Sequence, residues 1–71
     1  HNPADPAFGL QVAPIVLENG AWIAANCFIG PGVTVGANSL VGARSSVFTD
    51  LPADYICLGS PCKPRKPRVF N

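Results

Sequence analysis

The chain contains no methionine, one histidine and few charged residues, which make up 13% of its 71 positions and give a formal net charge of +1. No apolar run reaches the roughly 18 residues of a membrane-spanning helix, and no basic leader precedes an apolar segment. Neither a membrane span nor a secretion signal is therefore predicted in this stretch. A chain this short holds one small domain, which is marginally stable unless it is stapled, metallated or assembled. We therefore expect it to be part of a longer protein.

The cysteine content argues against a disulfide framework and against a metal site. Cys27, Cys57 and Cys62 are an odd number of cysteines in a short chain, unlike the paired cysteines of small secreted proteins. We therefore expect a reducing, cytoplasmic location. His1 is the only histidine, and four residues separate Cys57 from Cys62, so a conventional four-ligand zinc cluster cannot be assembled. No bound metal is expected.

Basic residues are concentrated near the C-terminal end. Four of the five lie within six positions, namely Lys63, Arg65, Lys66 and Arg68. Such a run is either a solvated tail or a contact for phosphate groups. Its interleaved prolines and its lack of an aromatic stacking pattern argue against nucleic-acid binding. A single small anionic ligand fits the run better.

An internal repeat of six residues organises the middle of the chain. The first position of each unit is aliphatic, and its members are Leu17, Ile23, Ile29, Val35, Val41 and Val47. The fifth position is small or β-branched, as a narrow interior requires, and its members are Ala21, Cys27, Val33, Ser39 and Ser45. Turn-forming residues fill the third and fourth positions, including Asn19-Gly20, Asn26, Pro31-Gly32, Asn38 and Arg44.

Six residues are too few for a helix and a turn, so the repeat predicts short strands joined by tight turns. Three strands make one triangular coil of 18 residues, which stacks Leu17 beneath Val35, Ile23 beneath Val41 and Ile29 beneath Val47. The predicted fold is an all-β parallel β-helix. An ordinary antiparallel β domain is the alternative, but it would show alternation of period two. Because each coil must cover its neighbour, we expect at least one or two further coils upstream.

The hexads from Pro14 to Val47, followed by the Gly59-Ser-Pro-Cys-Lys63 segment, resemble the C-terminal part of hexapeptide-repeat acyltransferases. The resemblance covers nearly the whole chain. It is strongest to sugar O-acetyltransferases of exopolysaccharide (colanic-acid-type) synthesis and to maltose/galactoside acetyltransferases. It implies a left-handed parallel β-helix, a homotrimer with active sites between neighbouring subunits, acetyl-CoA as the donor and a sugar or polysaccharide precursor as the acceptor.

The resemblance also implies roles for individual residues. His1-Asn2-Pro3 matches the loop that carries the family's general base, so His1 is the candidate catalytic residue. An imidazole with a pKa of about 6.5 can take the proton of a sugar hydroxyl as it attacks a thioester. Trp22 ends the first hexad and is expected to point outward in this register. It matches a tryptophan that lines the cleft near the pantetheine arm and the acceptor, although a packing role under a loop or at a subunit contact is also open.

The implied CoA-binding residues are spread along the chain. The positions of Ala25 and Ala43 offer backbone groups to the pantetheine arm in relatives. Phe48-Thr49 takes the place of a usual Thr-Lys pair, so Thr49 stands where a cation has been lost. The implied phosphate ligands are Lys63, Arg65 and Lys66, which form charge-assisted bonds. The prolines among them are expected to hold this tail extended.

Three segments and two functions follow from these patterns. Residues 1–16 are predicted to be the loop carrying His1, residues 17–49 the hexapeptide coils, and residues 50–71 a terminal strand with a basic, CoA-facing tail. The predicted function is acetyl transfer from acetyl-CoA to a sugar hydroxyl. The alternative from another class is a non-catalytic β-helix scaffold or oligomerisation module. A γ-class carbonic anhydrase is a third possibility, but it needs three zinc-binding histidines and this stretch supplies one.

Overall fold

Short strands at intervals of six residues follow one another along the chain. The computed structural model describes residues 13–69, and all the regular elements within this range are β-strands. Six have two residues each: β1 (Val16–Leu17), β2 (Trp22–Ile23), β3 (Phe28–Ile29), β4 (Thr34–Val35), β5 (Leu40–Val41) and β6 (Ser46–Val47). Two longer strands follow, β7 (Tyr55–Gly59) and β8 (Cys62–Pro67).

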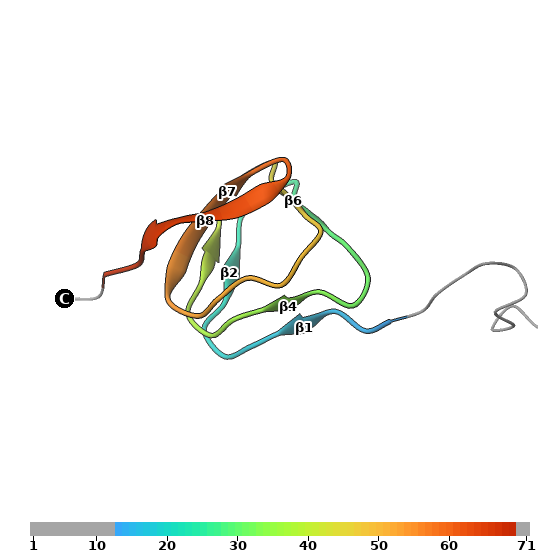
Figure 1. Ribbon diagram of the computed structural model, residues 1–71, viewed down its shortest axis with the longest axis horizontal. Coiled ribbons are helices and arrows are strands. Elements are labelled where there is room, and N and C mark those ends of the chain that lie inside the picture. Colours follow the sequence, from blue (N-terminus) through green and yellow to red (C-terminus); the bar gives the residue numbers. More distant parts are fainter. Residues whose placement is uncertain (1–12, 70–71) are drawn as a thin grey trace, which may run out of the picture.

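Strands 18 residues apart pair in parallel. β1 pairs with β4, β2 with β5 and β3 with β6, which places Leu17 beside Val35 and Ile23 beside Val41 in register. The predicted stacking is therefore confirmed, and the chain winds as a triangular coil with β1 and β4 along one side and β2, β7 and β8 along another (Figure 1). The antiparallel alternative is wrong for these coils because all three pairings are parallel.

The interior of the coil is a column of valines. Val35, Val41 and Val47, the first residues of the later hexads, are fully buried. Leu17, in the first coil of the described range, is 51% exposed, because no described coil covers its outer side. The predicted narrow interior at the fifth position is also found, since Ser39 and Ser45 are buried there.

The corners of the coil use left-handed backbone conformations. The fourth residue of every hexad from Gly20 to Arg44 has a positive φ, between 60° and 77°, and the others are Asn26, Gly32 and Asn38. Glycine and asparagine accept this region at little cost, which explains why they recur at this position. Arg44 adopts the same conformation without that advantage.

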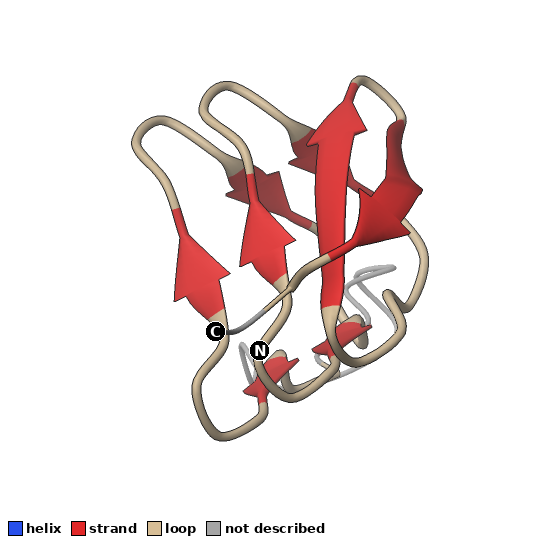
Figure 2. Cartoon of the chain, turned by 90° about the vertical axis from the view of Figure 1, so that its left-hand side faces the viewer, coloured by secondary structure: helices blue, strands red, loops and turns tan. Residues whose placement is uncertain are grey.

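The C-terminal end of the coil is closed by a hairpin. Leu51 bridges to Val35, and β7 then joins β5 in parallel with Ile56 beside Leu40. β8 folds back antiparallel to β7, so the sheet has the order β2-β5-β7-β8 and faces the viewer in Figure 2. The predicted terminal strand is present. The basic tail is extended, as its prolines suggested, but it is paired to β7 as a strand, which sequence composition did not indicate.

β1 begins at Val16, one residue before the predicted start of the coils at residue 17. The segment from residue 50 onward contains β7 and β8. Most of the predicted N-terminal loop, including His1, lies outside the described residues.

Candidate functional site

The outer face of the four-stranded sheet brings together residues from all four strands. Trp22, Leu40, Ile56 and Lys66 are successive partners across β2, β5, β7 and β8. Their neighbours Val41 and Cys57 are fully buried, so this row points away from the core, because side chains alternate along a strand. Trp22 is 62% exposed, which agrees with its predicted outward orientation.

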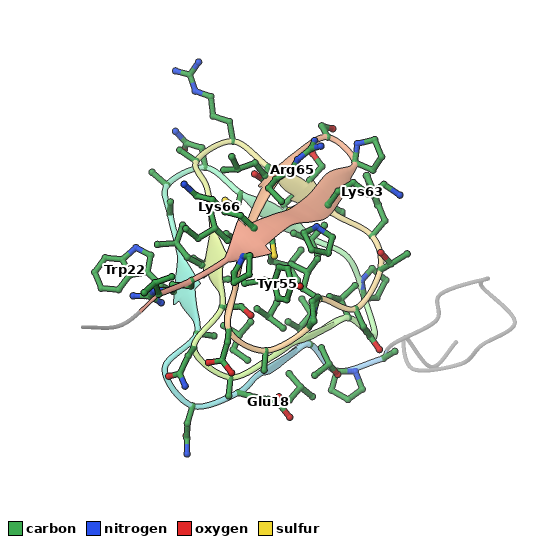
Figure 3. All side chains as sticks on the ribbon, turned by 60° about the vertical axis from the view of Figure 1, so that its left-hand side comes forward. Glu18, Trp22, Tyr55, Lys63, Arg65 and Lys66 are labelled. Atoms are coloured by element: carbon green, nitrogen blue, oxygen red, sulfur yellow. The ribbon has the colours of Figure 1, made fainter. Side chains whose placement is uncertain are left out.

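A β-bulge in the hairpin sets which tail residues share that face. Ile56 lies opposite Lys66 and Cys57 opposite Pro64, so Arg65 is an extra residue in β8. Lys63 lies opposite the exposed Leu58, and strict alternation from Lys63 would turn Lys66 to the other side. The extra residue restores Lys66 to the outer face, as bulges re-aim the side chains that follow them. Figure 3 shows Lys63, Arg65 and Lys66 along β8 and Trp22 projecting from the coil.

The tail arginines and lysines have different surroundings. The Arg65 Nε donates to the carbonyl oxygen of Leu58 at 3.3 Å, and an Arg68 Nη1 donates to that of Asn38 at 3.0 Å. The side chains of Lys63 and Lys66 are exposed and have no hydrogen-bond or ion-pair partner within residues 13–69. The arginines therefore hold the tail to the coil, whereas the lysines have their charge available for an anion.

The remaining predicted CoA-contacting residues lie at two different corners. Ala25 and Ala43 occupy the same corner in successive coils, where the Arg44 N–H donates to the Ala25 carbonyl at 3.0 Å. Both are exposed. Thr49 follows β6 at the corner that leads to Leu51. In the triangular coil this corner lies opposite the side formed by the β2-β5-β7-β8 sheet. A single chain thus places Lys63, Lys66 and Trp22 on one face and Thr49 elsewhere.

The cysteines are part of the packing. All three are free thiols, and Cys57 and Cys62 are buried. Burial raises the pKa of both thiols, and Cys62 adds to the increase at Cys57. At neutral pH they are therefore protonated and poor nucleophiles.

The described part of the chain has no group of three or more His, Cys, Asp or Glu side chains placed to hold a metal ion. Among residues 13–69 there is also no helix long and apolar enough to cross a membrane. The predicted base, His1, lies outside this range, so its geometry relative to Trp22 is not described.

The repeat itself decides the family. The family model described as "Bacterial transferase hexapeptide (six repeats)" matches residues 14–49, which include the strands β1 to β6. The chain belongs to the bacterial transferase hexapeptide family. Membership rests on half of the chain, and the hairpin with its basic strand follows the matched region.

Curated relatives of this hexapeptide-repeat chain extend the likeness into the hairpin. The "Putative colanic acid biosynthesis acetyltransferase WcaF" of Escherichia coli K12 is 44% identical over 69 residues, which are 97% of this chain and 38% of the relative. The galactoside O-acetyltransferase of the same strain is 44% identical over 50 residues, which are 70% of this chain and 25% of the relative. The chain thus spans well under half the length of either relative.

Two solved structures share the fold of this hexapeptide-repeat chain. One is a hexapeptide-repeat acetyltransferase of Vibrio cholerae in complex with acetyl coenzyme A, with a TM-score of 0.78 and 40% identity over 82% of this chain and 32% of the other. The second is a galactoside acetyltransferase in complex with coenzyme A, with a TM-score of 0.78 and 38% identity over 80% of this chain and 28% of the other.

Two features of the C-terminal hairpin could not be predicted from the sequence. The bulge at Arg65 has no signature in the residues themselves, and nothing distinguishes Arg68 from the other members of the basic run in the sequence. The available signal was the pair Pro64 and Pro67, which removes two backbone N–H donors from β8. A strand with so few donors needs other attachments, and the two arginines supply them.

Proposed function

We propose that the full-length protein is an O-acetyltransferase that moves an acetyl group from acetyl-CoA to a sugar hydroxyl. The observation that carries the proposal is the joint likeness, in sequence and fold, to two acetyltransferases solved with acetyl coenzyme A or coenzyme A. The family resemblance adds a left-handed coil and a homotrimer with active sites between subunits. The described residues would supply the last coils and the donor-binding tail of each subunit.

In the proposed reaction, His1 is the general base. The imidazole accepts the proton of the acceptor hydroxyl as the hydroxyl oxygen attacks the thioester carbonyl carbon. The tetrahedral intermediate collapses with cleavage of the carbon–sulfur bond, and the proton held by the imidazole passes to the departing CoA sulfur. Nothing is oxidised or reduced, and the products are an acetyl ester and free CoA thiol. The buried Cys57 and Cys62 take no part.

The outer face of the β2-β5-β7-β8 sheet is the proposed donor site. CoA carries a 3′-phosphate and a pyrophosphate, and the exposed Lys63 and Lys66 offer charge to them. Trp22, at the other edge of the same sheet, offers an apolar surface to the pantetheine arm. Backbone groups of Ala25 and Ala43 lie at an exposed corner in reach of a ligand running along the coil.

A site between subunits would explain why Thr49 lies away from the other proposed CoA-binding residues of its own chain. Thr49 lies at a corner away from the tail, and in a homotrimer a neighbouring subunit would present it to the same CoA molecule. This separation supports the proposed homotrimer. The loss of the usual cation at Thr49 would then be offset by the charge of Lys63 and Lys66.

Acceptor class and location complete the proposal. The relative WcaF is named for colanic acid biosynthesis and aligns with 97% of this chain, which favours a sugar acceptor in exopolysaccharide biosynthesis. The three free thiols suit a reducing compartment, so we place the enzyme in the cytoplasm.

The assignment of the base is tested with the full-length enzyme carrying His1→Ala. Free thiol release from acetyl-CoA is followed with and without a sugar acceptor. We expect acceptor-dependent turnover to fall by about 10²- to 10⁴-fold, the usual contribution of a positioned general base. Undiminished turnover with normal CoA binding would remove His1 from the mechanism but keep the transferase, whereas an inactive wild-type protein that does not bind CoA would support the scaffold alternative.

A further inference from the structure

We infer that Arg68 is a positioning residue that holds the lysines of β8 against the proposed CoA site. The inference rests on the proposed function, because it concerns how that donor site is kept in place. The chain's corner turns, the missing donors of β8 and the two bonds of Arg68 together carry it.

Arg68 completes a ladder of stacked corner turns. At the corner before β2, β5 and β7, the Asn38 N–H donates to the Asn19 carbonyl at 3.0 Å, and the Asp54 N–H donates to the Ala37 carbonyl at 2.9 Å. The Arg68 N–H then donates to the Asp54 carbonyl at 2.8 Å. The end of the tail is thus attached as the next rung of a ladder that begins in the first described coil.

The Arg68 side chain adds a second attachment on another coil. Its Nη1 donates to the carbonyl oxygen of Asn38 at 3.0 Å, one rung below the bond made by its own backbone. Asn38 has a φ of 61°, and it belongs to a fixed corner of the coil. Two bonds from one residue to two coils set both the position and the direction of the chain at the end of β8.

β8 is weakly attached to β7 by its own backbone, so an anchor at its end is needed to fix its position. Pro64 and Pro67 lack the N–H groups with which a strand normally donates to its neighbour, and the bulge at Arg65 interrupts the register. Lys66 lies between the bulge and Pro67 and has no side-chain partner within residues 13–69. Besides the pairing of Lys66 with Ile56, its position on the outer face therefore depends on attachments on either side, which are the bonds of Arg65 and Arg68.

The four tail cations thus divide into two kinds. Arg65 and Arg68 bind backbone carbonyls of the chain itself, and Lys63 and Lys66 present charge to phosphate. Loss of Arg68 should weaken binding of a donor that carries the phosphates, and it should do so through Lys66. It should leave almost unchanged the use of acetyl-pantetheine, which has no adenosine phosphates to be held.

The test uses the full-length enzyme with Arg68→Gln, Arg68→Lys and a Lys66→Gln background. We expect Arg68→Gln to raise the KM for acetyl-CoA about tenfold, equivalent to about 1.4 kcal/mol, with kcat and the KM for acetyl-pantetheine within about twofold. Arg68→Lys, which keeps a donor for Asn38, should recover part of the loss. In the Lys66→Gln background, Arg68→Gln should add little, because residues acting through one contact are not additive.

A second measurement reports on position without activity. Hydrogen exchange of the backbone amides of residues 65, 66 and 68 should speed up in Arg68→Gln, whereas Arg44→Gln, which removes an exposed arginine from another corner, should not change it. An active wild type whose Arg68→Gln variant shows unchanged exchange and KM overturns this inference alone. Fully additive effects of Arg68 and Lys66 also overturn it, in favour of direct phosphate contact by Arg68. A wild type without CoA binding overturns the proposed function and this inference together.

Discussion

Alanine at Gly36 should destabilise the protein more than alanine at an equivalent glycine of the same repeat. Gly36 is the second residue of its hexad and is buried where the segment before β7 crosses the coil. A Cβ added there would lie 2.6 Å from the Pro52 carbonyl carbon and 2.8 Å from the Ala53 Cα, and it would also meet the Ala53 nitrogen. These are backbone atoms, which cannot rotate aside as a side chain can.

The size of the effect follows from two opposing contributions. Overpacking of this kind costs about 1–3 kcal/mol, and contact with three backbone atoms points to the upper end of that range. Alanine also reduces the conformational entropy of the unfolded chain, which returns about 0.4–1 kcal/mol. We therefore expect Gly36→Ala to lower the free energy of unfolding by about 2 kcal/mol.

Gly30 provides the matched control. It holds the same position in the preceding hexad, and its added Cβ would approach the Val47 carbonyl oxygen at 3.2 Å and other atoms at 3.8 Å. Gly30→Ala should therefore change stability by less than about 0.5 kcal/mol. Gly42→Ala should fall between them, because its Cβ would meet the end of the Leu58 side chain, which can adopt another rotamer.

The assay is urea unfolding of the full-length variants at one protein concentration, followed by circular dichroism. A shift in midpoint without a change in slope reports stability alone. If Gly36→Ala is as stable as Gly30→Ala, the close passage of residues 52 and 53 over the coil is wrong, and with it the path that leads the chain into β7.

Three further predictions concern the core and the site. Ser45→Ala should lower the free energy of unfolding in urea by about 1–3 kcal/mol. The buried Ser45 hydroxyl donates to the Gly42 carbonyl at 2.7 Å and accepts from the Gly59 N–H at 3.2 Å, so its removal leaves the Gly59 N–H without this acceptor; an unchanged unfolding midpoint would contradict the prediction. Burial raises the pKa of Cys57 and Cys62, so the thiols of the unfolded chain lose their protons at lower pH than those of the folded chain. The free energy of unfolding should therefore fall as the pH rises above about 8.5. The fall should be smaller in Cys57→Ala, and an equal fall would show that Cys57 does not contribute to it. Trp22→Ala should leave the urea midpoint within about 0.5 kcal/mol because the side chain is exposed, yet it should raise the KM for acetyl-CoA; loss of stability without a kinetic effect would instead give Trp22 a packing role.

The coils could be predicted from the sequence because each position of the six-residue repeat has the same surroundings in every coil and is therefore filled by the same kind of residue. An aliphatic residue at Val35, Val41 and Val47 faces the same narrow interior, and Asn or Gly at the corners accepts the same positive φ. These requirements are local and repeat every six residues, so they leave a period that can be counted. The 18-residue stacking then follows from geometry alone.

The hairpin could not be predicted in the same way because nothing in it repeats. Pro64 and Pro67 indicate extended chain, but they do not tell which neighbour that chain pairs with. The bulge at Arg65 depends on the register between β7 and β8, and the bond from Arg68 to Asn38 joins residues 30 positions apart. Trp22 was correctly expected to face outward because its place in the hexad fixes its direction.

We propose that the full-length hexapeptide-repeat protein binds CoA, and isothermal titration with CoA measures that binding without needing the acceptor. We expect saturable heat with one site per subunit, weakened in Lys63→Gln/Lys66→Gln and increasingly weak as salt screens the phosphates. A non-catalytic scaffold would give no saturable heat at any salt concentration, and that result would rule out the proposed donor site.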